Sequence, residues 1–210
     1  NVQSPADMLS PGRIGMTAIL PVRFTAMKWY GKGPLETYPD RQCGGRMGVY
    51  SEDVRNQPFY LRPQEYGLHM ESRSMRLTDP DRADFVRFEA ACPMAMSAVP
   101  YSDLQLWNAR HPLELPAPEA LYVHLDYAHR GLGNSSCGPD VLPTYRIDDR
   151  PCHFGFALEA GLGEREDNPF GPIPEEIPAY HPWKAVGEQD RTPSYRDPSD
   201  PDQRSNAGMV

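Results

Sequence analysis

The stretch that decides the fold is Lys28-Trp29-Tyr30-Gly31-Lys32-Gly33-Pro34-Leu35-Glu36-Thr37-Tyr38-Pro39-Asp40-Arg41. A short apolar run meets glycines and a proline here, which predicts a turn directly after Trp29. A Trp at the edge of a turn can offer its flat ring to the apolar face of a sugar while the indole N–H reaches a polar group. From the residues alone, the alternative is that Trp29 is a core residue at the end of a strand.

Short apolar segments between turn residues occur on both sides of this stretch and indicate β-structure. Residues 85–90 and 121–126 alternate apolar and polar side chains, as half-buried strands do. Residues 14–24 alternate loosely, and Pro21 places that strand at an edge or a bulge. Further strands are expected at 27–30, 47–50, 59–61 and 152–158, and one helix at 102–110, where Ser102 can cap the first turn. This pattern predicts an all-β antiparallel sandwich.

More motifs follow the first stretch in order: Pro63-Gln64-Glu65-Tyr66-Gly67, Tyr101-Ser102-Asp103-Leu104, Arg110-His111-Pro112-Leu113-Glu114-Leu115, Leu125-Asp126-Tyr127 and Gly131-Leu132-Gly133-Asn134-Ser135-Ser136-Cys137-Gly138. Together, over residues 14–160, they resemble the C-terminal, small-chain-like domain of bacterial-type β-galactosidases of glycoside hydrolase family 2. Tyr66 stands where that family usually has Asn. The last loop lacks the Gly-Asp-Asp-Ser-Trp of the better-known members, so no function is carried onto it.

The resemblance implies a large antiparallel supersandwich of the galactose-mutarotase type. This chain matches only the later part of that domain, so some strands of the sandwich are expected to be missing. The domain is expected to span 14–160, after a polar connector at 1–13. Residues 161–210 hold eight prolines, ten acids and five bases. Such a segment buries too little apolar surface to offset the entropy of ordering it, which predicts a disordered tail.

The resemblance also implies that the complete protein is a retaining β-galactosidase that hydrolyses terminal non-reducing β-D-galactosides such as lactose. In the family, the catalytic glutamates and the ligands for Mg²⁺ and a monovalent cation lie on a (β/α)₈ barrel. A barrel takes about 250 residues, and this chain of 210 residues shows no βα repeat. We therefore assign no catalytic residue and no metal or cofactor site to this chain, and expect it to be inactive alone.

One site residue follows from the resemblance: Trp29, which would stack on the galactosyl part of the substrate. Three acids lie near the signature, but nothing in the pattern marks a matched catalytic pair among Glu36, Asp40 and Glu65. Asp40 and Arg41 can pair with each other or with the backbone of the turn. None of the six histidines is given a role.

Charge and composition limit the partners. The net charge of −8 argues against nucleic acid and anionic membranes, and no apolar run approaches the ~20 residues of a membrane span. The expected partners are the β-galactoside substrate and the remaining domains, or large chain, of the enzyme, which is expected to be a homo-oligomer when complete. Because the sequence begins with Asn1 and not Met, we expect a fragment or a processed product.

The four cysteines, Cys43, Cys92, Cys137 and Cys152, form no C-x-x-C pair. They are interpreted as unpaired thiols in a reducing compartment, which predicts a cytoplasmic protein. Two other functions stay open at this point. The chain could be a stand-alone carbohydrate-binding module that acts through Trp29, or a structural or assembly domain in which Trp29 is buried in a subunit contact.

Overall fold

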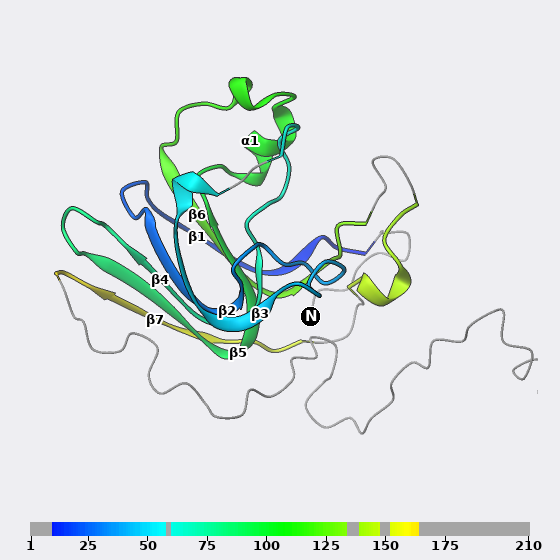
Figure 1. Cartoon of the computed structure of the whole chain (residues 1–210), viewed down its shortest axis with the longest axis horizontal. Helices are drawn as coiled ribbons and strands as arrows, with labels where there is room; N and C mark the ends of the chain where they lie inside the picture. Colours follow the sequence, from blue (N-terminus) through cyan, green and yellow to red (C-terminus); the bar gives the residue numbers. More distant parts are fainter. Residues whose placement is uncertain (1–9, 58–59, 134–138, 148–151, 164–210) are drawn as a thin grey trace, which may run out of the picture.

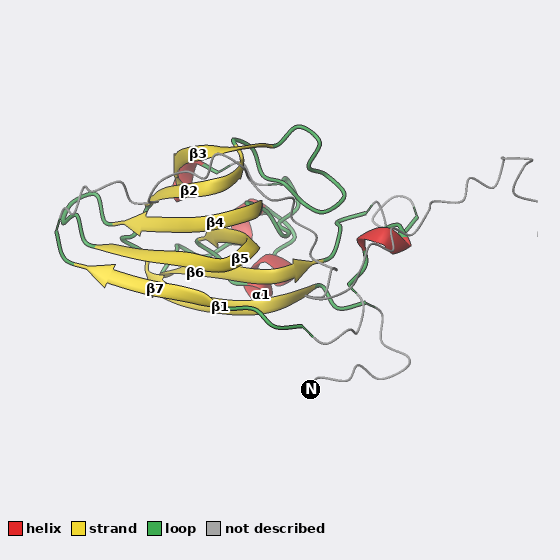
Figure 2. Cartoon of the chain, turned by 90° about the horizontal axis from the view of Figure 1, so that it is seen from below, coloured by secondary structure: helices red, strands yellow, loops and turns green. Residues whose placement is uncertain are grey.

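The computed structural model describes residues 10–57, 60–133, 139–147 and 152–163. They form one open antiparallel sheet of seven strands, which bends strongly (Figure 1) and whose strands lie side by side in Figure 2. The strands are β1 (Arg13–Pro21), β2 (Ala26–Gly33), β3 (Arg46–Asp53), β4 (His69–Thr78), β5 (Phe85–Val99), β6 (Ala120–His129) and β7 (Phe156–Gly161). The predicted all-β antiparallel fold is confirmed.

The order of the strands is β1-β6-β5-β4-β2-β3, and β7 also pairs with β5. The connections contain one α-helix and three turns of 3₁₀-helix: α1 (Asp103–Asn108), η1 (Val54–Asn56), η2 (Pro112–Glu114) and η3 (Pro143–Tyr145). None of the helices in the described part of the chain has the length and apolar composition that a membrane crossing needs.

Strand β5 organises the sheet because its two halves have different neighbours. Residues 85–90 pair with β7, and residues 95–99 pair with β6, while β4 runs along the other side. Pro93, which has no N–H to donate, lies between these two ladders. A proline is tolerated at this point because the strand is changing partners there.

Alternation along the strands builds two different faces. On β6, Leu121, Val123 and Leu125 enter the main apolar core. The residues between them face the other side of the sheet, where the polar side chains of His124 and Asp126 are also buried. The main core therefore lies on one face of the sheet, and buried charges lie on the opposite face.

The signature stretch has a different conformation from the one predicted. The turn does not follow Trp29 directly: β2 continues through Gly33, and the chain leaves the sheet only at Pro34. Gly31 and Gly33 are needed for close packing within the strand. A Cβ on Gly31 would lie 2.5 Å from Ser72 Oγ, and one on Gly33 would lie 2.6 Å from the ring of Tyr50.

Among the predictions for the other elements, one helix start is confirmed, one strand was missed and one predicted strand is wrong. Ser102 caps α1 through a capping box with Gln105, as the helix prediction required. Strand β4 was missed because its buried positions change from even to odd numbers at Ser74–Met75. This change directly follows irregular pairing with β5 between His69 and Ser74, a stretch that includes Glu71, whose φ is +55°. Tyr60 and Leu61, expected in a strand, are not in one.

Several expectations concern residues outside the described ranges. The predicted tail is described only as far as residue 163, where β7 has just ended. Of the predicted connector, residues 10–13 are described, and β1 already begins at Arg13. Cys43, Cys92 and Cys152 are free thiols, whereas Cys137 lies outside the described residues.

Candidate functional site

A cavity of about 690 Å³ lies beside the loop that follows β2. Its volume falls in the range of small-molecule pockets, about 300–1,000 Å³. Its walls come mainly from residues 33–45, which are the second half of the signature and the four residues after it, together with Glu52, Gln57, Gly67 and His69. Trp29 is not among the lining residues, although its neighbour His69 is.

Asp40 ties the signature loop to a distant loop of the chain. Its carboxylate accepts hydrogen bonds from the backbone N–H groups of Leu132 (3.0 Å) and Gly133 (2.7 Å), which lie more than 90 positions away in the sequence. The approach is close, because a Cβ on Gly131 would lie 2.8 Å from the carboxyl carbon of Asp40. Asp40 therefore holds two of the family-like motifs together, a partner that the sequence did not indicate.

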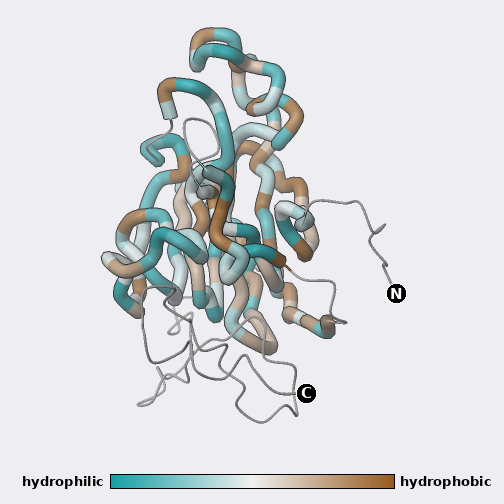
Figure 3. Tube along the Cα trace, turned by 90° about the vertical axis from the view of Figure 1, so that its right-hand side faces the viewer, coloured by the Kyte–Doolittle hydropathy of each residue, from teal (hydrophilic) through white to brown (hydrophobic). Residues whose placement is uncertain are grey.

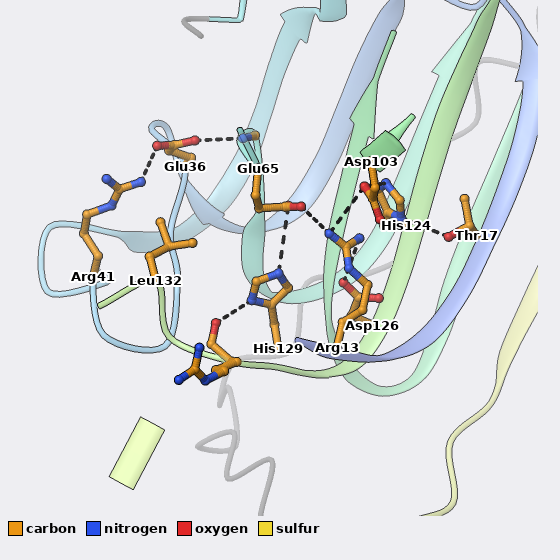
Figure 4. Close-up of polar contacts among 12 residues, drawn as sticks. Arg13, Thr17, Glu36, Arg41, Glu65, Asp103, His124, Asp126, His129 and Leu132 are labelled. Atoms are coloured by element: carbon orange, nitrogen blue, oxygen red, sulfur yellow. Dashed lines mark hydrogen bonds and ion pairs between the residues drawn. The ribbon is translucent and has the colours of Figure 1, made fainter. Parts of the chain in front are cut away.

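Glu36 ties the same loop to the segment before β4. One carboxylate oxygen accepts a hydrogen bond from the backbone N–H of Gly67 at 2.7 Å. The other accepts from the Tyr60 hydroxyl at 2.5 Å and pairs with Arg41, as Figure 4 shows for the ion pair. All of these partners hold the loop, so Glu36 has a structural role here.

The two hydrogen bonds that Asp40 accepts from Leu132 and Gly133 lead to a prediction about stability. Asp40→Ala should lower the free energy of unfolding by about 2 kcal/mol, because two backbone N–H groups lose their acceptor. The midpoint of urea unfolding measures this loss. Asp81→Ala, at an exposed aspartate, is the matched control and should change little. Equal midpoints for the two variants would contradict the tethering role.

A largely buried ionic cluster, drawn in Figure 4, lies on the face of the sheet that carries His124 and Asp126, opposite the main core. It consists of Arg13, Glu65, Asp103, His124, Asp126 and His129. Its exposed member is Asp103, whose side chain is 61% exposed. Arg13 is at its centre: its guanidinium pairs with Glu65 and lies 3.6 Å from Asp126 and 3.8 Å from Asp103. The cluster joins β1, β6, the 63–67 motif and the first turn of α1.

Burial shifts the titration of most members of the cluster. It raises the pKa of Glu65 to about 7 and that of Asp126 to about 8, against the opposing effect of the Arg13 charge. It lowers the pKa of His124 and of His129 to about 4, so both imidazoles are neutral near pH 7. Neutral groups cost less to bury than charged ones, which explains how several ionisable residues share this site.

The arrangement of the cluster does not fit a metal site. In the described ranges, no group of three or more His, Cys, Asp or Glu is placed to hold a metal ion. The cation among the carboxylates is the guanidinium of Arg13.

Trp29 lies inside the main core and not at the edge of a turn. Its side chain is 1% exposed, and its indole N–H donates to the Lys32 carbonyl at 3.1 Å. The ring stacks on His69 with centroids 3.9 Å apart and lies 5.4 Å from the ring of Tyr50. Burial lowers the pKa of His69 to about 4, so the stacked imidazole is neutral. This is the position that the core alternative predicts; the stacking role on a sugar stays a prediction.

A single open antiparallel sheet, with its main apolar core on one face and loops held by the carboxylates of Glu36 and Asp40, places the described part of the chain in the class of all-β domains. Its sequence matches the family model described as the β-galactosidase small chain, over residues 1–158. The chain belongs to this family.

The similar proteins with known names are β-galactosidases, in agreement with this family. The chain is 31% identical to a β-galactosidase of Staphylococcus xylosus over 73% of its length, and 36% identical to one of Arthrobacter sp. over 67%. It is 39% identical to the β-galactosidase BgaC of Bifidobacterium adolescentis over 73% of its length. The chain covers only 14–16% of these relatives.

Proposed function

We propose that this chain is the C-terminal, small-chain part of a retaining β-galactosidase that hydrolyses terminal non-reducing β-D-galactosides such as lactose. The match to the small-chain family over residues 1–158 carries this proposal. The chain covers a small share of its relatives, so the catalytic glutamates, Mg²⁺ and the monovalent cation belong to the rest of the enzyme in this proposal. A cytoplasmic location and assembly into a homo-oligomer are parts of the same proposal.

In this proposal the chain acts as a scaffold beside the catalytic domain. Glycoside hydrolysis uses two carboxyl groups, one as acid and one as nucleophile or base. Two of the acids near the signature, Glu36 and Asp40, accept hydrogen bonds from backbone N–H groups with their carboxylate oxygens. Glu36 also accepts one from the hydroxyl of Tyr60. Glu65 is paired with Arg13. These partners favour a structural use of all three acids.

The first test compares the chain alone with the complete natural protein. With an activated aryl β-galactoside, the purified 210-residue chain should show no turnover, and the complete protein should hydrolyse it with retention of configuration. Glu36→Gln and Glu65→Gln chains serve as controls for any trace activity. Turnover by the chain alone that either variant abolishes would move the chemistry into this domain.

Burial of Trp29 helps to choose between the two alternative functions, the carbohydrate-binding module and the structural or assembly domain. A stand-alone carbohydrate-binding module acting through Trp29 needs one free ring face, but the ring is 1% exposed and packed against His69. The observation therefore favours a structural domain as the second candidate, with Trp29 buried in the core of the chain itself and not in a subunit contact. Titration of the chain with galactose separates the two, since only a binding module would saturate at millimolar sugar.

A further inference from the structure

The connection between β5 and β6 carries large apolar side chains on its outside. On α1, Leu104 is 67% exposed and Trp107 is 84% exposed. These two are three positions apart, so they share one face of the helix. Leu113, on η2 of the same connection, is 92% exposed. We call these three side chains the α1 surface; in Figure 3 this connection is at the top, with apolar segments far from the sheet.

The α1 surface is held in a defined conformation. Ser102 and Gln105 form a capping box at the start of the helix, and Leu106 is buried with Tyr66 and Val99 in a small apolar cluster beneath it. The turn after the helix is fixed by the Arg110 backbone N–H, which donates to Glu114 at 2.9 Å. Exposed apolar groups on an anchored frame lose little entropy when a partner covers them.

The exposed Trp is the most informative of the three. Trp is enriched among the residues that carry most of the binding energy of protein interfaces. A Trp on the free face of a helix contributes nothing to the packing of this chain, and large exposed apolar groups that cluster mark interaction sites. Leu106, on the opposite side of the helix, is the residue that anchors it.

The size of the relatives indicates which partner covers the α1 surface. The relatives contain about six to seven times as much sequence as the matched part, since it covers 14–16% of them. The rest of such a protein is large enough to cover the outer face of a short helix.

We propose that Leu104, Trp107 and Leu113 form the surface through which this chain docks on the remaining domains of the same β-galactosidase. The inference rests on the proposed function for the identity of the partner. Docking removes the three side chains from water and covers the outer face of α1. The partner surface is accordingly apolar, with polar groups at the rim near Asp103 and Glu114.

Hydroxyl-radical footprinting of Trp107 tests the docking. The side chain should be oxidised rapidly in the 210-residue chain and on the order of tenfold more slowly in the complete natural protein, where the interface excludes water. Trp29, 1% exposed, is the internal reference and should react slowly in both. Equal oxidation of Trp107 in the two samples would overturn the proposal, whether or not the complete protein is active.

A pair of variants separates docking from folding. Trp107→Ser and the control Leu142→Ser, at a leucine that is exposed before η3, should both leave the melting temperature of the 210-residue chain unchanged. In the complete protein, only Trp107→Ser should lower the melting temperature and speed proteolysis around α1. An equal loss in the chain alone would overturn the docking role. Protection of Trp107 in a complete protein that hydrolyses no galactoside would support the docking surface and reject the enzyme assignment.

Discussion

Trp29→Leu should lower the free energy of unfolding of the 210-residue chain by about 3 kcal/mol, the scale of large aromatic truncations in protein cores. The reason is the position of the ring. Trp29 packs in the main core against His69 and Tyr50, and its indole N–H donates to the Lys32 carbonyl. Leucine would leave a cavity beside His69 and remove the indole donor to the Lys32 carbonyl. Urea unfolding at neutral pH measures the loss.

The same substitution at an exposed site is the matched control. Trp107→Leu exchanges a side chain that is 84% exposed, so it should change the unfolding free energy of the chain little. In the complete β-galactosidase that we propose, the Michaelis constant for a galactoside decides whether Trp29 also stacks on the substrate. A large loss of stability with an unchanged KM would falsify the stacking role. A raised KM with unchanged stability would place the ring against the substrate instead.

Arg13→Met should destabilise the chain by about 3 kcal/mol at about pH 8, because it leaves two buried carboxylates without their cation. Glu65 and Asp126 both pair with the Arg13 guanidinium, and Asp126 is 1% exposed on the sheet. Methionine keeps much of the length of the arginine stem, so the change removes mainly the charge. The loss should shrink to under about 1 kcal/mol at about pH 5, where both carboxyl groups carry protons and need no cation.

The sign of this pH dependence follows from the direction of the shifts. The folded pKa values of Glu65 and Asp126 are raised, from 4.5 and 3.8 to about 7 and about 8. The folded chain therefore holds protons that the unfolded chain has released, and these two groups lose stability as the pH rises from about 4 to about 8. The three histidines with pKa values lowered to about 4 act in the opposite sense, and their contribution is lost as the pH falls from 6.5 to about 4. Below pH 6.5 the three histidines outweigh the two carboxyl groups, and above it only the carboxyl groups act, so the wild-type chain should be most stable at about pH 6.5.

Melting temperatures across this pH range measure both effects. Arg55→Met is the control, because Arg55 pairs with Asp53 at the surface, where its side chain is 66% exposed. Solvent screens such a pair, so its loss should be small and should not depend on pH above 5. A loss for Arg13→Met that is equal at acid and alkaline pH would show that packing of the side chain, and not its charge, matters.

Local patterns in the sequence were sufficient for several elements. The alternation at residues 121–126 identified β6, because each second residue of a half-buried strand faces the core. Ser102 identified the start of α1, because a capping box needs only residues three positions apart. The order of the motifs was sufficient for the family. These features depend on neighbours in the chain and can be derived without the fold.

Strand β4 marks the limit of such patterns. Its buried positions change from even to odd numbers at Ser74–Met75, directly after the pairing with β5 is irregular between His69 and Ser74. A bulge of this kind breaks the period of two that identifies a strand, and nothing local in the sequence announces it. The glycines of the signature are similar: Gly31 makes room for Ser72, which lies on the neighbouring strand β4.

The sequence by itself determined the all-β class and the family, because the alternation of side chains and the order of the motifs are properties of the chain alone. Only the tertiary structure decided that Trp29 is buried, that Asp40 binds the loop at Leu132 and that Arg13 gathers Glu65 and Asp126. These partners come from strands and loops that are distant in the sequence. Their energies depend on desolvation and on distances of a few ångströms, which exist only once the sheet has formed.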